Sequence, residues 1–201
     1  MAAIAAPYGI RVISDSVGAT PRLHRIPNGI QQGLLANIFK GQAIKLDPVQ
    51  GTITTVTNVG GVPDGLWGVF DGVDYTPVGG RPVVSPFWPA GAQYSTTENM
   101  FVYFYPLWLP STRLMIQADG AVPQTAFGMS FNLTNMAAGS TVTGRSAATV
   151  GFAGIAAGSQ GQLTLVEFAP EMNDTVGDAF TDLICTVANP QIGFRGVVST
   201  G

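Results

Sequence analysis

Turn-forming residues divide residues 65–91 into three short extended runs, and this spacing constrains the fold more than any other feature of the sequence. Residues 66–70 have the composition of a buried strand, and Asp71-Gly72 follows as a turn dipeptide. An alternating run covers residues 73–76, and a third extended run covers residues 81–88. Strands of this length, joined by turns rich in Gly, Pro and Asp, predict a β-meander.

The same pattern continues through the rest of the chain. Residues 42–46 and 52–59 flank a turn at residues 47–51, and the second run is almost entirely β-branched, so we expect a hairpin. Pro123 suits the first position of a single helical turn. Further strands are expected at residues 100–109, 113–118, 129–133, 162–168 and 179–188.

These runs amount to roughly ten to twelve short strands, and no helix longer than two turns is expected. The sequence therefore predicts an all-β fold, which is either a compact β-barrel or sandwich of short antiparallel strands, or two linked β-modules.

Four segments organise the predicted fold. Residues 1–29 are expected to form an extended N-terminal arm, and residues 30–133 the main β-domain. Residues 134–161 are a loop region rich in Gly, Ala, Ser and Thr, and residues 162–201 supply C-terminal strands that complete the fold. Within the arm, residues 20–27 alternate between two prolines, which indicates an edge strand or a strand that pairs with a partner. The arm either reaches a neighbouring subunit or is a mobile terminus.

The surface is unusually poor in charge. Charged residues make up only 10% of the 201 residues, against roughly 25% in an ordinary soluble domain. A free monomer usually carries more charge, so we expect other protein to cover much of the surface. The net charge of −3 is scattered and forms no basic stripe, which argues against a nucleic-acid partner.

The sequence lacks features of membrane insertion, disulfide bonding and secretion, and this indicates the cellular compartment in which the protein is made. No apolar run approaches the roughly 20 residues that span a bilayer, so we expect no membrane partner. Cys185 is the single cysteine, which fits synthesis in a reducing cytosol. The apolar N-terminus is short and lacks a basic start, so it is a poor signal peptide.

Residue types used in catalysis occur in unfavourable settings. His24 is the only histidine and lies between two prolines, and no nucleophile-elbow motif is present. Cys185 lies in an apolar strand, where we expect an inert core thiol. Asp71 and Asp74 lack the longer acidic ladder of a calcium loop. We therefore expect no catalytic residue, no cofactor and no metal, and a protein that is not an enzyme.

A loose acidic run lies near the C-terminus. Its default interpretation is a solvated loop, and the sharper alternative is an interface with basic residues of a partner. The run consists of Glu167, Glu171, Asp174, Asp178 and Asp182.

Aromatic residues are the main candidates for protein contacts, because they are enriched at interfaces. Trp67 is expected to lie in the core, so Trp67→Ala should unfold the domain. Trp88 and Trp108, both flanked by prolines, are either core or interface residues. For Trp88 we expect alanine to leave the domain folded and to weaken assembly. Together with the arm, these considerations predict a protein interface at Tyr8, Ile10, Arg11, His24, Arg25, Trp88, Tyr105 and Trp108.

Several short motifs resemble those of tailed-bacteriophage capsid decoration (cement) proteins. The resemblance runs nearly end to end, with a departure at residues 105–110, where a more polar stretch is expected in that family. The motifs are Pro7-Tyr8-Gly9-Ile10-Arg11-Val12, residues 38–46, 68–75, 87–91 and 114–120, and Gly144-Arg145-Ser146.

The resemblance implies a structural virion protein that binds the outside of the assembled capsid lattice and stabilises it. Its partners would be the major capsid protein and further copies of itself, with a trimer favoured. It would be made in the host cytoplasm and would end on the capsid exterior. The alternative is a head-fibre, tail or receptor- or carbohydrate-binding β-module of a phage particle. Aromatic platforms with acidic partners in one groove would favour that alternative.

Overall fold

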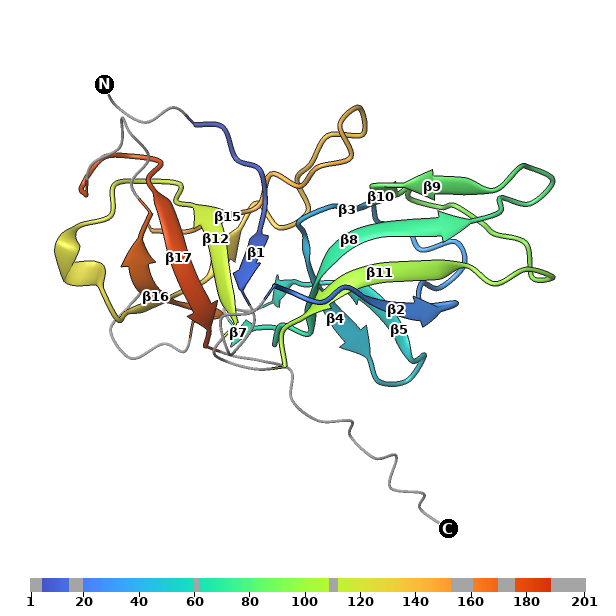
Figure 1. Ribbon diagram of the computed structural model, residues 1–201, viewed down its shortest axis with the longest axis horizontal. Coiled ribbons are helices and arrows are strands. Elements are labelled where there is room, and N and C mark those ends of the chain that lie inside the picture. The colour runs from blue at the N-terminus through green and yellow to red at the C-terminus, as the bar shows by residue number, and fades with distance from the viewer. Residues whose placement is uncertain are drawn as a thin grey trace, which may run out of the picture.

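Two antiparallel sheets of short strands make up most of the molecule (Figure 1). The computed structural model describes residues 5–14, 20–59, 62–108, 112–152, 161–169 and 176–188. The predicted all-β class is confirmed. The arrangement is sandwich-like, and both large sheets have open strand orders, so the described strands close no barrel. No helix within these ranges is long and apolar enough to cross a membrane.

The smaller of the two large sheets has the order β1-β12-β17-β16-β13. Its strands are β1 (Arg11–Ser14), β12 (Arg113–Gln117), β17 (Asp182–Val187), β16 (Leu163–Phe168) and β13 (Ser130–Phe131). The larger sheet has the order β2-β11-β8-β4-β5, and β9 pairs with β8. Its strands are β2 (His24–Pro27), β11 (Phe101–Pro106), β8 (Gly68–Tyr75), β4 (Ala43–Asp47), β5 (Thr52–Thr55) and β9 (Val83–Ser85).

Short two-stranded pairs complete the fold. The predicted helical turn after Pro123 is present as the 3-10 turn η1 (Gln124–Ala126). The predicted hairpin is present as well, because β4 pairs with β5. The remaining pairs are β3 (Ile38–Phe39) with β10 (Phe87–Trp88), β14 (Leu133–Thr134) with β15 (Thr149–Val150), and β6 (Asn58–Val59) with β7 (Val62–Pro63).

The N-terminal segment supplies an edge strand to each large sheet. β1 pairs with β12 in one sheet, and β2 pairs with β11 in the other. Of the two alternatives for residues 20–27, the edge strand is the one observed. Over its described residues, the segment expected as an extended arm is therefore part of the fold. β12 and β13, which come from residues 113–131, share a sheet with the C-terminal strands β16 and β17.

β8 runs straight through Asp71-Gly72, so the turn predicted there is wrong. The pairing of β8 with β11 shifts register at this point and leaves Asp71 as the extra residue of a β-bulge. Gly72 is needed for close packing, because a Cβ atom there would lie 2.9 Å from the carbonyl oxygen of Ser85. The dipeptide therefore lets β8 curve and pack against its neighbour, and it does not end the strand.

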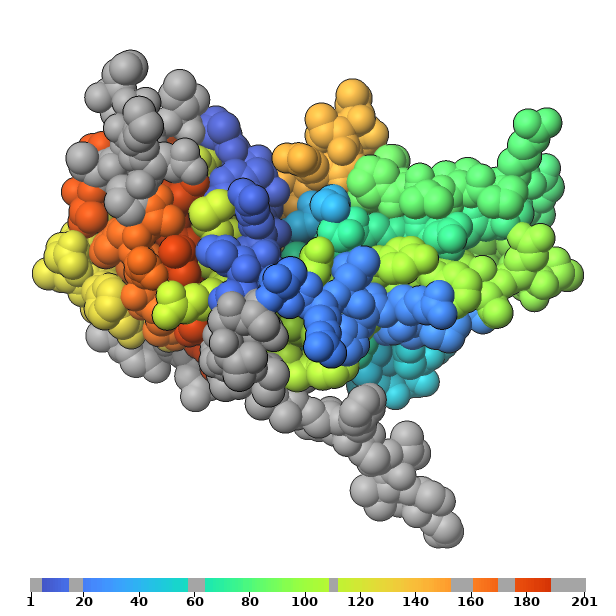
Figure 2. Space-filling view, in the orientation of Figure 1, coloured from blue at the N-terminus to red at the C-terminus, as the bar shows by residue number. Residues whose placement is uncertain are grey.

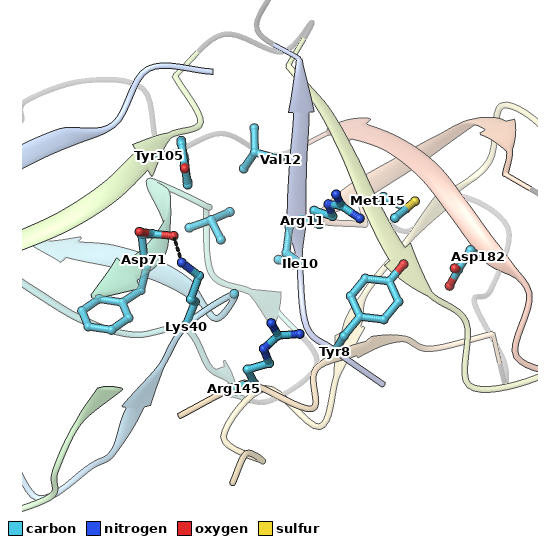
Figure 3. Close-up of a pocket in the computed structure, with 13 residues that line it drawn as sticks. Tyr8, Ile10, Arg11, Val12, Lys40, Asp71, Tyr105, Met115, Arg145 and Asp182 are labelled. Carbon is cyan, nitrogen blue, oxygen red and sulfur yellow. Dashed lines mark ion pairs between the residues drawn. The ribbon is translucent and has the colours of Figure 1, made fainter. Parts of the chain in front are cut away.

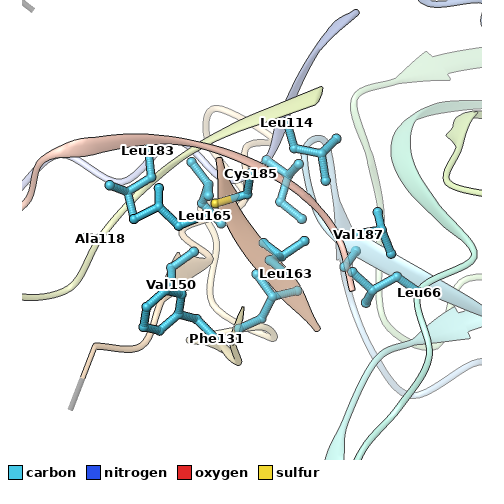
Figure 4. Close-up of a cluster of buried hydrophobic side chains, with 14 of the residues drawn as sticks. Leu66, Leu114, Ala118, Phe131, Val150, Leu163, Leu165, Leu183, Cys185 and Val187 are labelled. Carbon is cyan, nitrogen blue, oxygen red and sulfur yellow. The ribbon is translucent and has the colours of Figure 1, made fainter. Parts of the chain in front are cut away.

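One apolar cluster, which we call the shared core, joins the two sheets (Figure 4). β17 alternates between half-buried and buried residues, as a strand with one covered face should. The cluster includes residues of the larger sheet and its connections, so the covering layer comes from across the junction. Its members include Leu66, Val69, Leu107, Leu114, Ile116, Leu163, Leu165, Leu183, Cys185 and Val187.

A second cluster, the aromatic core, lies along the larger sheet and contains Trp88. The Trp88 side chain is fully buried, and its ring centroid lies 5.0 Å from that of Tyr75 and 6.3 Å from that of Tyr94. The prediction that Trp88 is a surface interface residue is therefore wrong. The physical reason is the pairing of β10 with β3, which places Trp88 opposite Ile38, itself fully buried.

Asp64 connects the two sheets through polar contacts. Its carboxylate accepts hydrogen bonds from Lys45 Nζ at 2.6 Å and from the backbone N–H of Thr57 at 2.8 Å. Its carbonyl oxygen accepts one from the buried side chain of Gln162 at 3.0 Å, next to the start of β16. Partial burial raises the pKa of the Asp64 carboxyl, but the bonds from Lys45 and Thr57 outweigh it, so the net pKa lies below its ordinary value of 3.8.

Trp88→Ala is expected to lower the free energy of unfolding by about 3–5 kcal/mol, because it removes a fully buried ring. Trp108→Ala should cost far less, because that ring is 38% exposed. Urea unfolding of both variants and of the wild type measures the difference. Equal losses for the two variants would contradict this assignment of core and surface.

Asp64→Asn should destabilise the protein at neutral pH, because the ionised carboxylate accepts bonds that the amide oxygen accepts more weakly. The folded-state pKa is lowered, so the stabilisation is complete above the unfolded pKa and is lost as pH falls through the folded value. The difference in unfolding free energy between wild type and variant should therefore shrink below about pH 3.8. Urea titrations at neutral and acidic pH would show it, and a difference independent of pH would argue against the carboxylate contacts.

Candidate functional site

Two adjoining pockets lie along β1 and the end of β11. The larger has a volume of about 600 Å³ and the smaller about 150 Å³. Val12 and Tyr105 line both pockets, so we treat them as one site, the inter-sheet groove. Figure 3 shows its larger part, with Lys40, Asp71 and Tyr105 on one side of β1 and Met115 on the other.

Three segments that are far apart in the sequence meet at the larger pocket. The backbone N–H of Ile10 donates to the carbonyl oxygen of Gly41 at 2.7 Å. The N–H of Ser146 donates to the carbonyl oxygen of Lys40 at 2.9 Å, and the N–H of Lys40 donates to that of Gly144 at 2.9 Å. These bonds fix residues 10, 40–41 and 144–146 beside one another.

Glycine permits this close crossing. Gly9 and Gly41 have φ angles of +78° and +82°, which favour glycine over residues with a Cβ atom. A Cβ atom at Gly9 would also lie 2.8 Å from the carbonyl oxygen of Gly41. The side chains next to the crossing are Arg11, Lys40 and Arg145, so the crossing brings three cations to one pocket.

The charges in the larger pocket are only partly paired. Lys40 Nζ lies 2.7 Å from a carboxylate oxygen of Asp71, the residue displaced by the bulge in β8 (Figure 3). Bulges commonly redirect a side chain in this way. Within the described ranges, neither Arg11 nor Arg145 forms an ion pair. Their guanidinium groups remain able to take a carboxylate from another molecule.

An aromatic series leads from the core to the smaller pocket. Trp67 is buried and stacks on Phe104, with ring centroids 4.6 Å apart. Trp108 lies 5.8 Å from Trp67 and 5.6 Å from His24, the latter edge to face. Because Trp108 rests on these rings and is still 38% exposed, its ring is held in place and presented to solvent.

Six of the eight predicted interface residues line the inter-sheet groove. Tyr8, Ile10, Arg11 and Tyr105 line the larger pocket, and His24, Tyr105 and Trp108 line the smaller one. The Ile10 side chain, just before β1, also belongs to the shared core and is only 4% exposed.

The other two predicted residues lie elsewhere. Arg25 is exposed on β2, with its guanidinium carbon 5.0 Å from the centroid of the Phe101 ring, and it does not line either pocket. Trp88 is in the aromatic core.

The sequence reasoning missed most of the charged residues of the groove. Lys40, Asp71, Arg145 and Asp182 come from four separate segments, and no local pattern connects them. Lys40, Asp71 and Arg145 each lie in a motif of the decoration-protein resemblance, and Asp182 belongs to the acidic run.

Cys185 is in the core, as predicted. Burial raises the pKa of its thiol to about 12. The thiolate is the nucleophilic form, so this residue is suppressed as a nucleophile at neutral pH.

Comparison of the chain with protein-family models, with curated proteins and with solved structures gives no match. The resemblance to capsid decoration proteins therefore stays a prediction from the sequence motifs.

In the native protein, Cys185 should not react with a chromogenic disulfide reagent at neutral pH, and it should react fully once urea has unfolded the chain. The reason is its complete burial together with the raised pKa of the thiol. Absorbance of the released thiolate measures both rates. Rapid labelling of the native protein would show that β17 opens or that the thiol is accessible.

Proposed function

We propose that the protein is a structural protein of a tailed-phage virion, which binds the outside of the assembled capsid lattice and stabilises it. One observation carries the proposal. Three of the motifs that resemble decoration proteins, at residues 7–12, 38–46 and 144–146, are far apart in the sequence and meet at the inter-sheet groove. If proteins with these motifs share a binding function, the motifs are expected to lie together at the surface that binds the partner, as these three do.

The surface chemistry around the groove supports a protein partner. On the visible face, the N-terminal residues, in blue, lie beside the orange C-terminal strands and over the larger sheet (Figure 2). β1 and β2 are both edge strands, and edge strands offer backbone groups for pairing. Ile13, Leu23 and Trp108 add exposed apolar surface from the same segments and from the residues after β11. A partner that covers these groups would also account for the low charge of the chain.

The proposed partner is the major capsid protein, with further copies of this chain as a homo-oligomer, a trimer being favoured. A capsid repeats one interface many times, so a modest affinity for each copy is sufficient. The protein would be made in the host cytoplasm and act on the capsid exterior, without nucleic-acid or membrane contacts and without enzymatic activity.

A head-fibre, tail or carbohydrate-binding module is the second candidate, and one observation favours it. Tyr8 and Tyr105 line the larger pocket together with Asp71 and Asp182. This is the combination of aromatic faces and carboxylates that the alternative requires. Copy number in the particle separates the candidates, because a lattice-binding protein approaches the abundance of the major capsid protein and a fibre or tail protein does not.

Purified protein should co-sediment with capsids assembled without it and raise the temperature at which they break open. Trp108→Ala should weaken binding at least about tenfold, as expected for a presented tryptophan at an interface. Val49→Ala is the matched control, since Val49 is 85% exposed and lies outside the groove, and it should bind as the wild type does. Failure to bind or stabilise capsids would refute the proposal, and glycan-array binding would then support the alternative.

A further inference from the structure

The inter-sheet groove is opposite in charge to the rest of the chain. Four cations, Arg11, Arg22, Lys40 and Arg145, line its two pockets, against the two carboxylates Asp71 and Asp182. Its formal charge is therefore +2, whereas the whole chain carries −3, which leaves −5 for the remainder. A concave site with an excess of one sign attracts ligands of the other sign.

Three of these four cations form no ion pair with a carboxylate of the described residues. Within the described ranges, Lys40 pairs with Asp71, while Arg11, Arg22 and Arg145 form no ion pair. Arginine binds carboxylates through two parallel hydrogen bonds, so unpaired arginines favour an acidic ligand over a neutral one. The smaller pocket adds an apolar position beside Trp108. The groove thus suits an extended polypeptide that carries both acidic and apolar side chains.

The chain itself contains such a sequence. Residues 146–194 include no lysine or arginine but five acidic residues. One of the five, Glu167, already pairs with Arg113 of its own copy. Three others lie in residues 171–178, interspersed with Met172 and Val176. Residues 170–175 lie outside the described ranges and enter here as sequence alone. This is the charge and apolar content that the groove would accept.

We propose that the inter-sheet groove of one copy binds the acidic segment 171–178 of a second copy. Carboxylates of the segment pair with Arg11 and Arg145, and an apolar side chain enters the smaller pocket beside Trp108. The contact joins two different surfaces, so it is heterologous, and a rotation that closes it produces a ring. This inference deepens the homo-oligomer part of the proposed function, and it does not depend on capsid binding.

The direct test uses a fluorescein-labelled peptide of residues 171–178 and fluorescence anisotropy. It should bind the full-length protein, and added salt should weaken binding. A control peptide with Gln and Asn in place of its three acidic residues should bind at least about tenfold more weakly, because each charge-assisted hydrogen bond contributes on that scale. Equal binding of the two peptides overturns the proposal.

Protein variants test the groove side. The double variant Arg11→Gln, Arg145→Gln should lose peptide binding at least about tenfold. Arg81→Gln is the matched control, because Arg81 is exposed and lies outside both pockets, and it should retain full binding. Thermal unfolding establishes that both variants are folded. An equal loss in Arg81→Gln would show a non-specific charge effect and would overturn the proposal.

Sedimentation velocity tests the assembly itself. The wild type should associate as its concentration rises, and the double variant should remain monomeric. A wild type that is monomeric at all concentrations and does not bind the peptide contradicts the inference. Capsid co-sedimentation of the same double variant distinguishes the two proposals. A variant that no longer self-associates can still bind capsids, and a protein that self-associates can fail to bind capsids.

Discussion

Apolar contact between the two large sheets is the interaction on which the rest of the molecule depends. β12, β16 and β17 bury one face each, and that face needs a covering layer. Residues of the larger sheet and its connections, such as Leu66 and Val69, provide it in the shared core. Each fully buried aliphatic side chain contributes about 1.5–3 kcal/mol, so the junction contributes strongly to stability. The inter-sheet groove lies at the same junction, so its geometry follows from how the sheets pack.

Short-range sequence signals were sufficient for the fold class. The hairpin of β4 and β5 and the alternating strand β17 could be predicted because turn residues and side-chain alternation are local. Asp71-Gly72 shows where such signals fail. A dipeptide typical of turns lies inside the longest strand, because pairing with β11 on one side and with β4 and β9 on the other outweighs its local preference. The prediction for Trp88 was wrong for a similar reason, since only the pairing of β10 with β3 decides which way its ring faces.

Part of the candidate site could also be predicted from local sequence patterns. Tyr8, Arg11, His24 and Trp108 could be nominated from their own surroundings in the sequence, and the structure places them along one groove. Lys40 and Arg145 lie in motifs of the resemblance, but they were not among the predicted interface residues. Arg145 comes near Arg11 only because residues around Gly9, Gly41 and Ser146 cross within hydrogen-bonding distance. No local pattern shows that segments this distant in the sequence come together, so the sequence alone did not show that these cations share one pocket.

The two edge strands of the N-terminal segment also have a consequence for the order of folding. β1 pairs with residues 113–115 and β2 with residues 101–104, so both lie far in sequence from their partners. During translation this segment leaves the ribosome well before either partner strand exists. Contacts of such long sequence separation slow folding, and unpaired strands are prone to associate with other chains in the interval. Proline and charged residues on an edge strand discourage pairing with other chains, so the prolines and arginines of residues 20–27 protect this segment from association before its partner strand is made.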